Sequence, residues 1–142
     1  IRDRVATDHA PHTLEEKNNK YLNCPSGGPM VQHSLNAMFE HYLNKRISLE
    51  KIVEKMCHNP AILFRIKNRG YIRKNYFADL VVLNPNKSYT VDKSNILYKC
   101  GWSPFDGKKF NSVVTHTFVN GNLVYNNGEF DESFRGSKIL FK

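Results

Sequence analysis

The sequence predicts an α/β protein in which one short strand precedes a helical segment and a small β unit follows. An apolar, strand-like run occupies residues 5–7, and apolar residues then recur at helical spacing from residue 31 to residue 64. From residue 78 onward, β-branched and apolar residues form strand-length runs separated by turn signals. A lone strand with helices behind it has no partner strand in its own half, so we expect the rest of a sheet or barrel upstream.

The composition is that of a globular domain. The chain has 142 residues, of which 40% are hydrophobic and 24% are charged. No apolar run approaches the roughly 20 residues that a membrane-spanning helix needs, so we expect a soluble, cytoplasmic protein with no membrane partner. The three cysteines are widely spaced and form no CxxC pair, which indicates neither a disulfide framework nor a thiolate zinc site.

The net charge of +8 makes nucleic-acid binding worth considering, because Lys and Arg contacts to phosphates supply most of such affinity. The basic residues are scattered along the chain, and their densest stretch, residues 65–74, straddles a predicted helix end and turn. No recognisable nucleic-acid motif accompanies it. We therefore expect a solvated basic surface and no nucleic-acid partner.

The first third of the sequence is predicted to be a long loop without regular structure. After residues 5–7 it contains Pro11, Pro25 and the run SGGP at residues 26–29, which break both helices and strands. Long loops in compact proteins usually carry function, so this segment is where we look for a site.

Three helices are predicted next. Apolar residues at helical spacing from Met30 predict an amphipathic helix that ends around residues 44–46. Ser48 is a suitable N-cap for the second helix. Asn59 and Pro60 predict a third, short helix, with Asn59 as its cap and proline at the first helical position, where its missing N–H costs nothing.

The second half is predicted to be mostly β-structure, starting after Gly70. Residues 78–83 have the composition of a buried strand. Residues 113–119 and 122–125 are separated by Asn-Gly, the pair that best tolerates the positive φ angles of a tight hairpin turn. Residues 86–112 are expected to form a long ordered loop with a short strand near residues 89–91.

The residues that could carry chemistry lie in residues 6–12, with the sequence ATDHAPH. At the end of a barrel strand, Asp8 could bind a divalent metal through one oxygen and move a proton with the other. The residues alone leave an alternative open, in which Asp8 caps a turn before Pro11 and the histidines are exposed. The D-H-x-x-H pattern by itself is not a zinc signature, because the number of ligands is too small.

The motifs resemble those of one family. Residues 5–13 resemble the eighth-strand motif of dihydroorotases, in the amidohydrolase superfamily, where the consensus is close to ATDHAPHT. Further segments match in order and at suitable spacing: SGGPM at 26–30, NPA at 59–61, RGYI at 69–72, ADLV at 78–81, SPFDG at 103–107 and VVTHTFVNG at 113–121. The NPA and ADLV passages also occur in hydantoinases and allantoinases, whereas DHAPH is more selective.

This resemblance implies a fold and an activity. Residues 1–67 would be the C-terminal segment of a TIM (β/α)8 barrel, comprising its last strand and helices, and residues 68–142 the C-terminal part of a small β-sandwich domain. The implied reaction is the reversible cyclisation of N-carbamoyl-L-aspartate to L-dihydroorotate in pyrimidine biosynthesis. The alternatives are another cyclic amide hydrolase, resembling hydantoinase or dihydropyrimidinase, and a non-catalytic homologue that acts as a scaffold.

The resemblance also implies residue roles. Asp8 would be a metal ligand and the catalytic acid/base, and His12 would contact the substrate carboxylate. The backbone from Pro25 to Gly28 would border the pyrimidine ring. His9 matches the motif without a chemical step of its own, so we expect a supporting or packing role. The remaining histidines match no ligand position: His33, His41, His58 and His116.

The implied cofactor is zinc, as one or two ions held mostly by histidines and a carboxylated lysine of earlier barrel strands. This sequence has no His-x-His pair and no candidate for that lysine. We therefore expect the missing N-terminal portion of the enzyme as a partner, with homo-oligomers left open. The isolated chain is expected to be inactive and to bind zinc poorly, because one carboxylate cannot hold a catalytic zinc.

Overall fold

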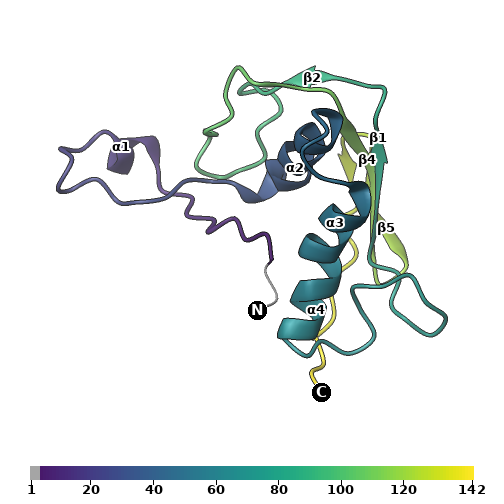
Figure 1. Cartoon of the computed structure of the whole chain (residues 1–142). Coiled ribbons are helices and arrows are strands. Elements are labelled where there is room, and N and C mark those ends of the chain that lie inside the picture. Colours follow the sequence, from purple (N-terminus) through teal and green to yellow (C-terminus); the bar gives the residue numbers. More distant parts are fainter. Residues whose placement is uncertain (1–3) are drawn as a thin grey trace.

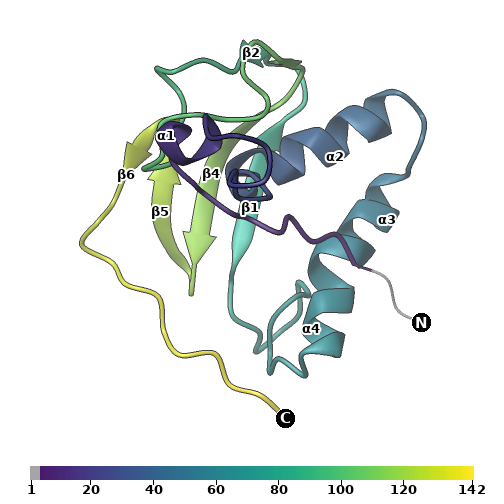
Figure 2. The ribbon, with the colours of Figure 1, turned by 90° about the vertical axis from the view of Figure 1, so that its left-hand side faces the viewer.

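The chain is described by a computed structural model that covers residues 4–142. An extended segment leads into a projecting arm, residues 13–27. From there the chain returns to three helices and then to two small sheets (Figure 1). The helices and the larger sheet lie side by side (Figure 2). None of the helices in this range has the length and apolar character that a membrane-spanning helix requires.

The predicted strand at residues 5–7 is extended but forms no regular strand. Its Val5 N–H donates to the carbonyl of Lys55 at 3.2 Å, and further along His9 forms an isolated parallel bridge with Gly28. A strand needs a continuous neighbouring backbone, and a helix and a loop flank this segment instead. The sequence correctly predicted its extended conformation but not its pairing.

The arm contains a short helix that was not predicted from the sequence. Helix α1 (Leu14–Lys17) is held by a capping box, in which Thr13 and Glu16 exchange side-chain and backbone hydrogen bonds. Lys17 closes the arm by donating to the carbonyls of Pro25 at 2.7 Å and Gly27 at 3.1 Å. The prediction that the first third has no regular structure was therefore wrong over one helical turn.

The first predicted helix is confirmed. It consists of the 3-10 turn η1 (Val31–His33) and helix α2 (Ser34–Leu43). The buried Asn36 side chain donates to the Ser112 carbonyl at 2.8 Å, which ties the helix to the start of the sheet. The buried face of α2 therefore holds a hydrogen-bonding residue as well as the apolar Phe39.

The second and third predicted helices form one continuous helix. Ser48 caps α3 (Leu49–Val53) by accepting from the Lys51 N–H, as predicted, and the chain continues through the π-helical turn η2 (Glu54–His58) into α4 (Asn59–Leu63). Asn59 has helical backbone angles and gives its N–H to Glu54, so its prediction as an N-cap was wrong. The π-helical turn accommodates Pro60, which has no N–H to donate.

The larger sheet is antiparallel, with strands in the order β1 (Leu80–Asn84), β4 (Val113–Val119), β5 (Asn122–Asn126) and β6 (Glu129–Phe130). Asn120 and Gly121 have φ angles of +52° and +85°, which confirms the predicted hairpin turn. The short strand predicted near residues 89–91 is β2 (Tyr89–Thr90), which pairs with β3 (Lys109–Phe110).

Strand β1 is not buried, contrary to prediction. Val81 is 51% exposed and Val82 is 46% exposed, because β1 lies at one edge of the sheet. Its N-terminal end is fixed by Asp79, which pairs with Arg69 and accepts the Asn120 N–H at 2.8 Å. Arg69 also donates to the Asn120 side chain at 2.6 Å, so residues of two motif passages hold the hairpin turn against β1.

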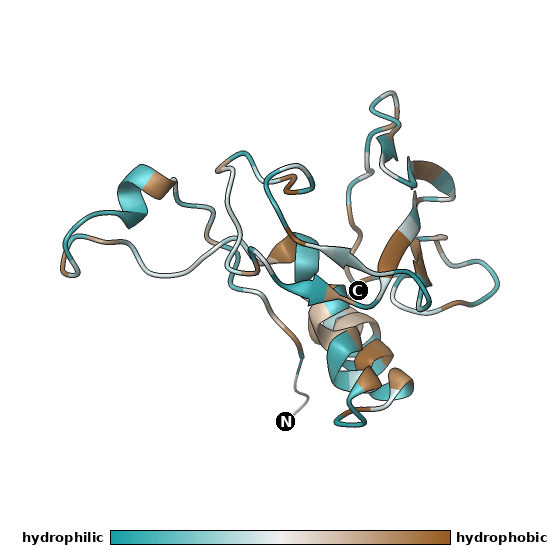
Figure 3. Cartoon of the chain, turned by 90° about the horizontal axis from the view of Figure 1, so that it is seen from above, coloured by the Kyte–Doolittle hydropathy of each residue, from teal (hydrophilic) through white to brown (hydrophobic). Residues whose placement is uncertain are grey.

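The best-buried part of the described chain lies where the loop of residues 86–112 covers the start of α2. His33, Val91 and Phe110 are almost completely buried there. The His33 ring stacks on Phe110 and meets Phe105 edge-on. By contrast, most of the arm is hydrophilic (Figure 3).

Candidate functional site

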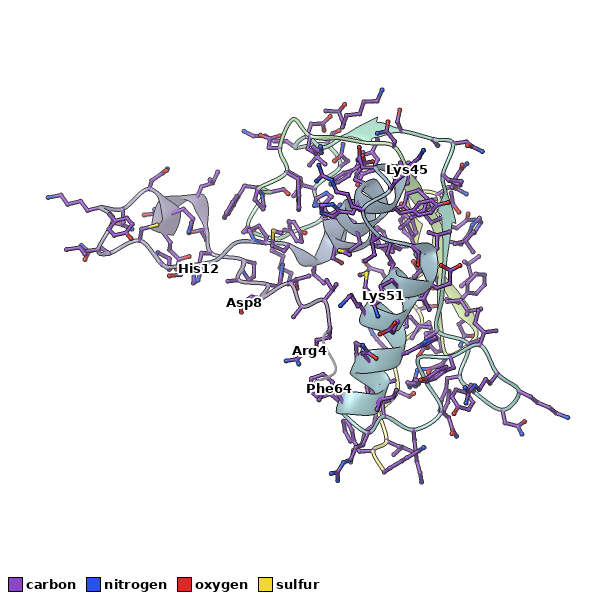
Figure 4. All side chains as sticks on the ribbon, in the orientation of Figure 1. Arg4, Asp8, His12, Lys45, Lys51 and Phe64 are labelled. Atoms are coloured by element: carbon purple, nitrogen blue, oxygen red, sulfur yellow. The ribbon has the colours of Figure 1, made fainter. Side chains whose placement is uncertain are left out.

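Asp8 lies where the extended segment bends towards the arm. Its φ angle is +43°, a left-handed conformation that aspartate tolerates better than most residues. The residue is exposed, and its side chain projects away from α2 and α3 (Figure 4). The bend therefore presents the carboxylate on the open side of the described chain.

His12 lies four residues further along, at the base of α1. Its Nδ1 is 3.6 Å from a carboxylate oxygen of Glu16, and 35% of its side chain is exposed. Its carbonyl accepts the Trp102 indole N–H at 2.7 Å. The pKa of Glu16 is lowered, first by its hydrogen bond from the Thr13 backbone and further by His12. His12 thus stands beside a carboxylate while keeping part of its ring accessible.

The SGGP loop lies directly against the Asp8 segment. The Ala10 N–H donates to the Gly28 carbonyl at 3.1 Å. Gly27 has a φ angle of +85°, and a Cβ atom there would come within 2.8 Å of the Ala10 side chain. Only glycine fits this approach. Pro25 lies on the arm, where its carbonyl receives Lys17.

His9 has a defined contact that the sequence did not reveal. Its Nδ1 is 3.1 Å from the Met30 amide nitrogen and 3.4 Å from that of Val31, and its ring lies 5.3 Å from Tyr98. Tyr98 in turn accepts the Gln32 N–H at 2.8 Å. These partners are 21 to 89 residues from His9, so no local pattern could have identified them.

The arrangement can offer a metal ion one carboxylate. Within residues 4–142, no three or more His, Cys, Asp or Glu side chains stand close enough together to hold a metal ion. Asp8 fits the part of a single exposed ligand, since carboxylate oxygen is an accepted donor to zinc. A complete coordination sphere would need ligands from elsewhere.

A family model identifies the relatives of this chain. Residues 1–124 match the model described as the amidohydrolase family. The chain belongs to the amidohydrolase family. This membership confirms the superfamily that its motifs indicated.

Several dihydroorotases are similar to this amidohydrolase chain in sequence. The dihydroorotase of Clostridioides difficile (strain 630) is 38% identical over 123 residues, which are 86% of this chain and 28% of that protein. The dihydroorotase of Pyrococcus horikoshii is 36% identical over 137 residues, 96% of this chain and 31% of that protein. The chain thus spans under a third of the length of these curated relatives.

Solved structures with a similar fold are hydantoinases. A D-hydantoinase (dihydropyrimidinase) from Thermus sp. superposes with a TM-score of 0.84 at 24% identity, covering 91% of this chain and 29% of that one. An L-hydantoinase (dihydropyrimidinase) from Arthrobacter aurescens gives 0.81 at 32% identity, with 90% and 30% covered. These matches confirm the expected fold class, an α/β part of an amidohydrolase barrel protein.

Proposed function

We propose that this chain is part of a dihydroorotase, the enzyme that reversibly cyclises N-carbamoyl-L-aspartate to L-dihydroorotate. The observation that carries the proposal is its sequence identity of 38% and 36% to dihydroorotases over 86% and 96% of its length. The DHAPH motif lies at the bend where a carboxylate is presented, which adds support from the site itself.

The remaining part of the enzyme would be an N-terminal portion outside this sequence. The dihydroorotase matches cover only 28% and 31% of their relatives, which leaves ample length for it. In this arrangement, residues 1–67 belong to the hydrolase barrel and residues 68–142 to the β-sandwich domain. The N-terminal portion would supply most ligands of one or two zinc ions, with Asp8 as the ligand from this chain.

Asp8 would be the proton carrier. A zinc ion bound beside it would lower the pKa of a water molecule to about 7 and polarise the substrate carbonyl. In the hydrolytic direction, the Asp8 carboxylate takes the proton of the attacking water and delivers it to the ring nitrogen as the C–N bond breaks. In the biosynthetic direction the proton moves back.

His12 and the SGGP loop would bind the substrate. A ring nitrogen of His12 can donate a hydrogen bond to the substrate carboxylate. Its Nδ1 lies 3.6 Å from a carboxylate oxygen of Glu16, and part of the ring stays accessible. The backbone between Pro25 and Gly28 lies against the Asp8 segment and would border the pyrimidine ring. This loop would therefore hold the ring beside the acid/base.

A hydantoinase-like or dihydropyrimidinase-like activity is the second candidate. The match to the Arthrobacter aurescens L-hydantoinase (dihydropyrimidinase), with a TM-score of 0.81 at 32% identity, favours it. A non-catalytic scaffold is the third candidate function, and the presence of both Asp8 and His12 argues against it.

A substrate screen of the full-length enzyme separates the three candidate functions. Dihydroorotate opened faster than hydantoin or dihydrouracil supports our proposal, and the reverse order contradicts it.

The first testable prediction concerns Asp8 in the full-length enzyme. Asp8→Asn removes the charge while keeping a residue that tolerates the left-handed backbone at φ +43°. We expect turnover of dihydroorotate to fall by at least about 1,000-fold with an unchanged melting temperature, because both proton transfer and one metal contact are lost. Asp8→Ala should be equally inactive. Activity within about tenfold of wild type would contradict the assigned role.

A further inference from the structure

The turn η1, which leads into α2, obtains hydrogen-bond partners for its first N–H groups from distant parts of the chain. The N–H groups of a first helical turn have no partner within the helix, and a nearby side chain usually satisfies them. Here Met30, which precedes η1, makes no side-chain capping bond. Instead, His9 Nδ1 receives the Met30 and Val31 N–H groups, and the Tyr98 hydroxyl receives that of Gln32.

These contacts fix the hydrogen-bonding role of one His9 ring nitrogen. Nδ1 accepts the Met30 and Val31 N–H groups, at 3.1 Å and 3.4 Å. Tyr98, whose ring lies 5.3 Å away, is itself held by the Gln32 N–H. His9 therefore has a fixed place between the helix start and the loop of residues 86–112.

The same residue fixes the backbone on the C-terminal side of Asp8. His9 pairs with Gly28 in a parallel bridge, and the next residue, Ala10, donates its N–H to the Gly28 carbonyl at 3.1 Å. Asp8 immediately precedes this anchored stretch and has a φ angle of +43°. Such a conformation persists when its surroundings hold it in place.

We propose that His9 is a positioning residue for the reaction: its Nδ1 anchors the segment to Met30 and Val31 at the start of η1 and so fixes the direction in which the Asp8 carboxylate points. This inference rests on the proposed function of Asp8. It assigns His9 no contact with substrate or metal. The geometry is demanding, since a misplacement of about 1 Å can cost about 100-fold in rate.

His9→Asn and His9→Gln separate the effect of the anchoring hydrogen bond from that of side-chain size. His9→Asn places an acceptor oxygen one bond from Cγ, as Nδ1 is, whereas His9→Gln places its acceptor further out. In the full-length enzyme we expect His9→Asn to keep kcat for dihydroorotate within about threefold of wild type. His9→Gln and His9→Ala should lose about 10- to 100-fold in kcat with KM within about threefold. His41→Ala, on the exposed part of α2, is the matched control and should match wild type.

Amide hydrogen exchange gives a readout that needs no catalysis. Peptides covering residues 8–11 and 29–32 should exchange faster in His9→Ala and His9→Gln, and at the wild-type rate in His9→Asn. If the wild-type enzyme does not open dihydroorotate, the proposed function fails, and this exchange pattern still decides whether His9 anchors the segment. Unchanged exchange in His9→Ala, or no recovery in His9→Asn, would overturn the inference.

Discussion

His33 is a buried histidine, and one of its two ring nitrogens has no hydrogen-bond partner among the described residues. It is completely buried, and its Nδ1 lies 3.4 Å from the Tyr98 hydroxyl and 3.3 Å from that of Ser103. Its Nε2 has no hydrogen-bond partner within the described residues. Burial lowers the pKa of His33 below its ordinary value of 6.5, because the charged form cannot be solvated there.

The sign of the resulting pH dependence follows from proton binding. As the pH falls through 6.5, the unfolded chain binds a proton on His33 more readily than the folded chain does, so the free energy of unfolding decreases. We expect His33→Phe to reduce this decrease, measured by urea unfolding of the full-length enzyme at about pH 7.5 and about pH 5.5. His41→Phe, at an exposed position of the same helix, should leave it unchanged. An identical decrease in His33→Phe and wild type would contradict this.

Single residues differ in how far the sequence reveals them. Asp8 and His12 could be selected because their seven-residue motif resembles that of the dihydroorotases; the residues alone left a turn-capping role for Asp8 open. The capping role of His9 and the burial of His33 could not be, because they depend on distant residues. His9 accepts N–H groups 21 and 22 residues away, and His33 is covered by Phe105 and Phe110, more than 70 residues away.

At the scale of elements, caps and turns were the most predictable features. Ser48 and the Asn120–Gly121 turn were correct because each depends on the conformation of a few adjacent residues. The π-helical turn η2 was missed, because Pro60 is compatible both with a new helix start and with a continuing helix that widens ahead of it. The exposure of β1 depends on its place at the sheet edge, which local pattern does not encode.

Gly70 allows the segment after α4 to pack closely on the helix. Its φ angle is +79°, and a Cβ atom there would lie 2.6 Å from the Ala61 side chain and 2.7 Å from the Cys57 carbonyl oxygen. We expect Gly70→Ala to destabilise the full-length enzyme by about 2–5 kcal/mol, combining left-handed strain with overpacking. Thermal or urea unfolding measures this loss.

Gly101→Ala is the matched control for Gly70. Gly101 has a similar φ angle of +70°, but nothing lies within 4 Å of the position of an added Cβ atom. Its substitution should cost only the backbone strain, about 1–2 kcal/mol. An equal loss of unfolding free energy in the two variants would show that close contact of the added Cβ atom with Cys57 and Ala61 does not contribute to the loss in Gly70→Ala.

At the scale of the whole molecule, the chain exposes more surface than its size predicts. Its accessible area is 10161 Å² for a mass of 16.5 kDa. A compact monomer of this mass exposes about 7,600 Å². Part of the excess is the arm, whose Leu22 is 92% exposed, and part is the apolar surface of β1 and of the C-terminal segment, including Phe141 at 61%. Apolar surface of this kind favours association with another protein chain or with the proposed N-terminal portion of the enzyme.

This surface leads to a prediction for the chain produced by itself. We expect the isolated chain to bind anilinonaphthalene sulfonate strongly, and co-expression with the proposed N-terminal portion to reduce the fluorescence severalfold, because the exposed apolar side chains become covered. The isolated chain should also retain no stoichiometric zinc after dialysis, since no three or more His, Cys, Asp or Glu side chains among residues 4–142 stand close enough together to hold a metal ion. Weak dye binding by the isolated chain would mean that its apolar surface needs no cover. Tight zinc binding would mean that its ligands lie within this sequence.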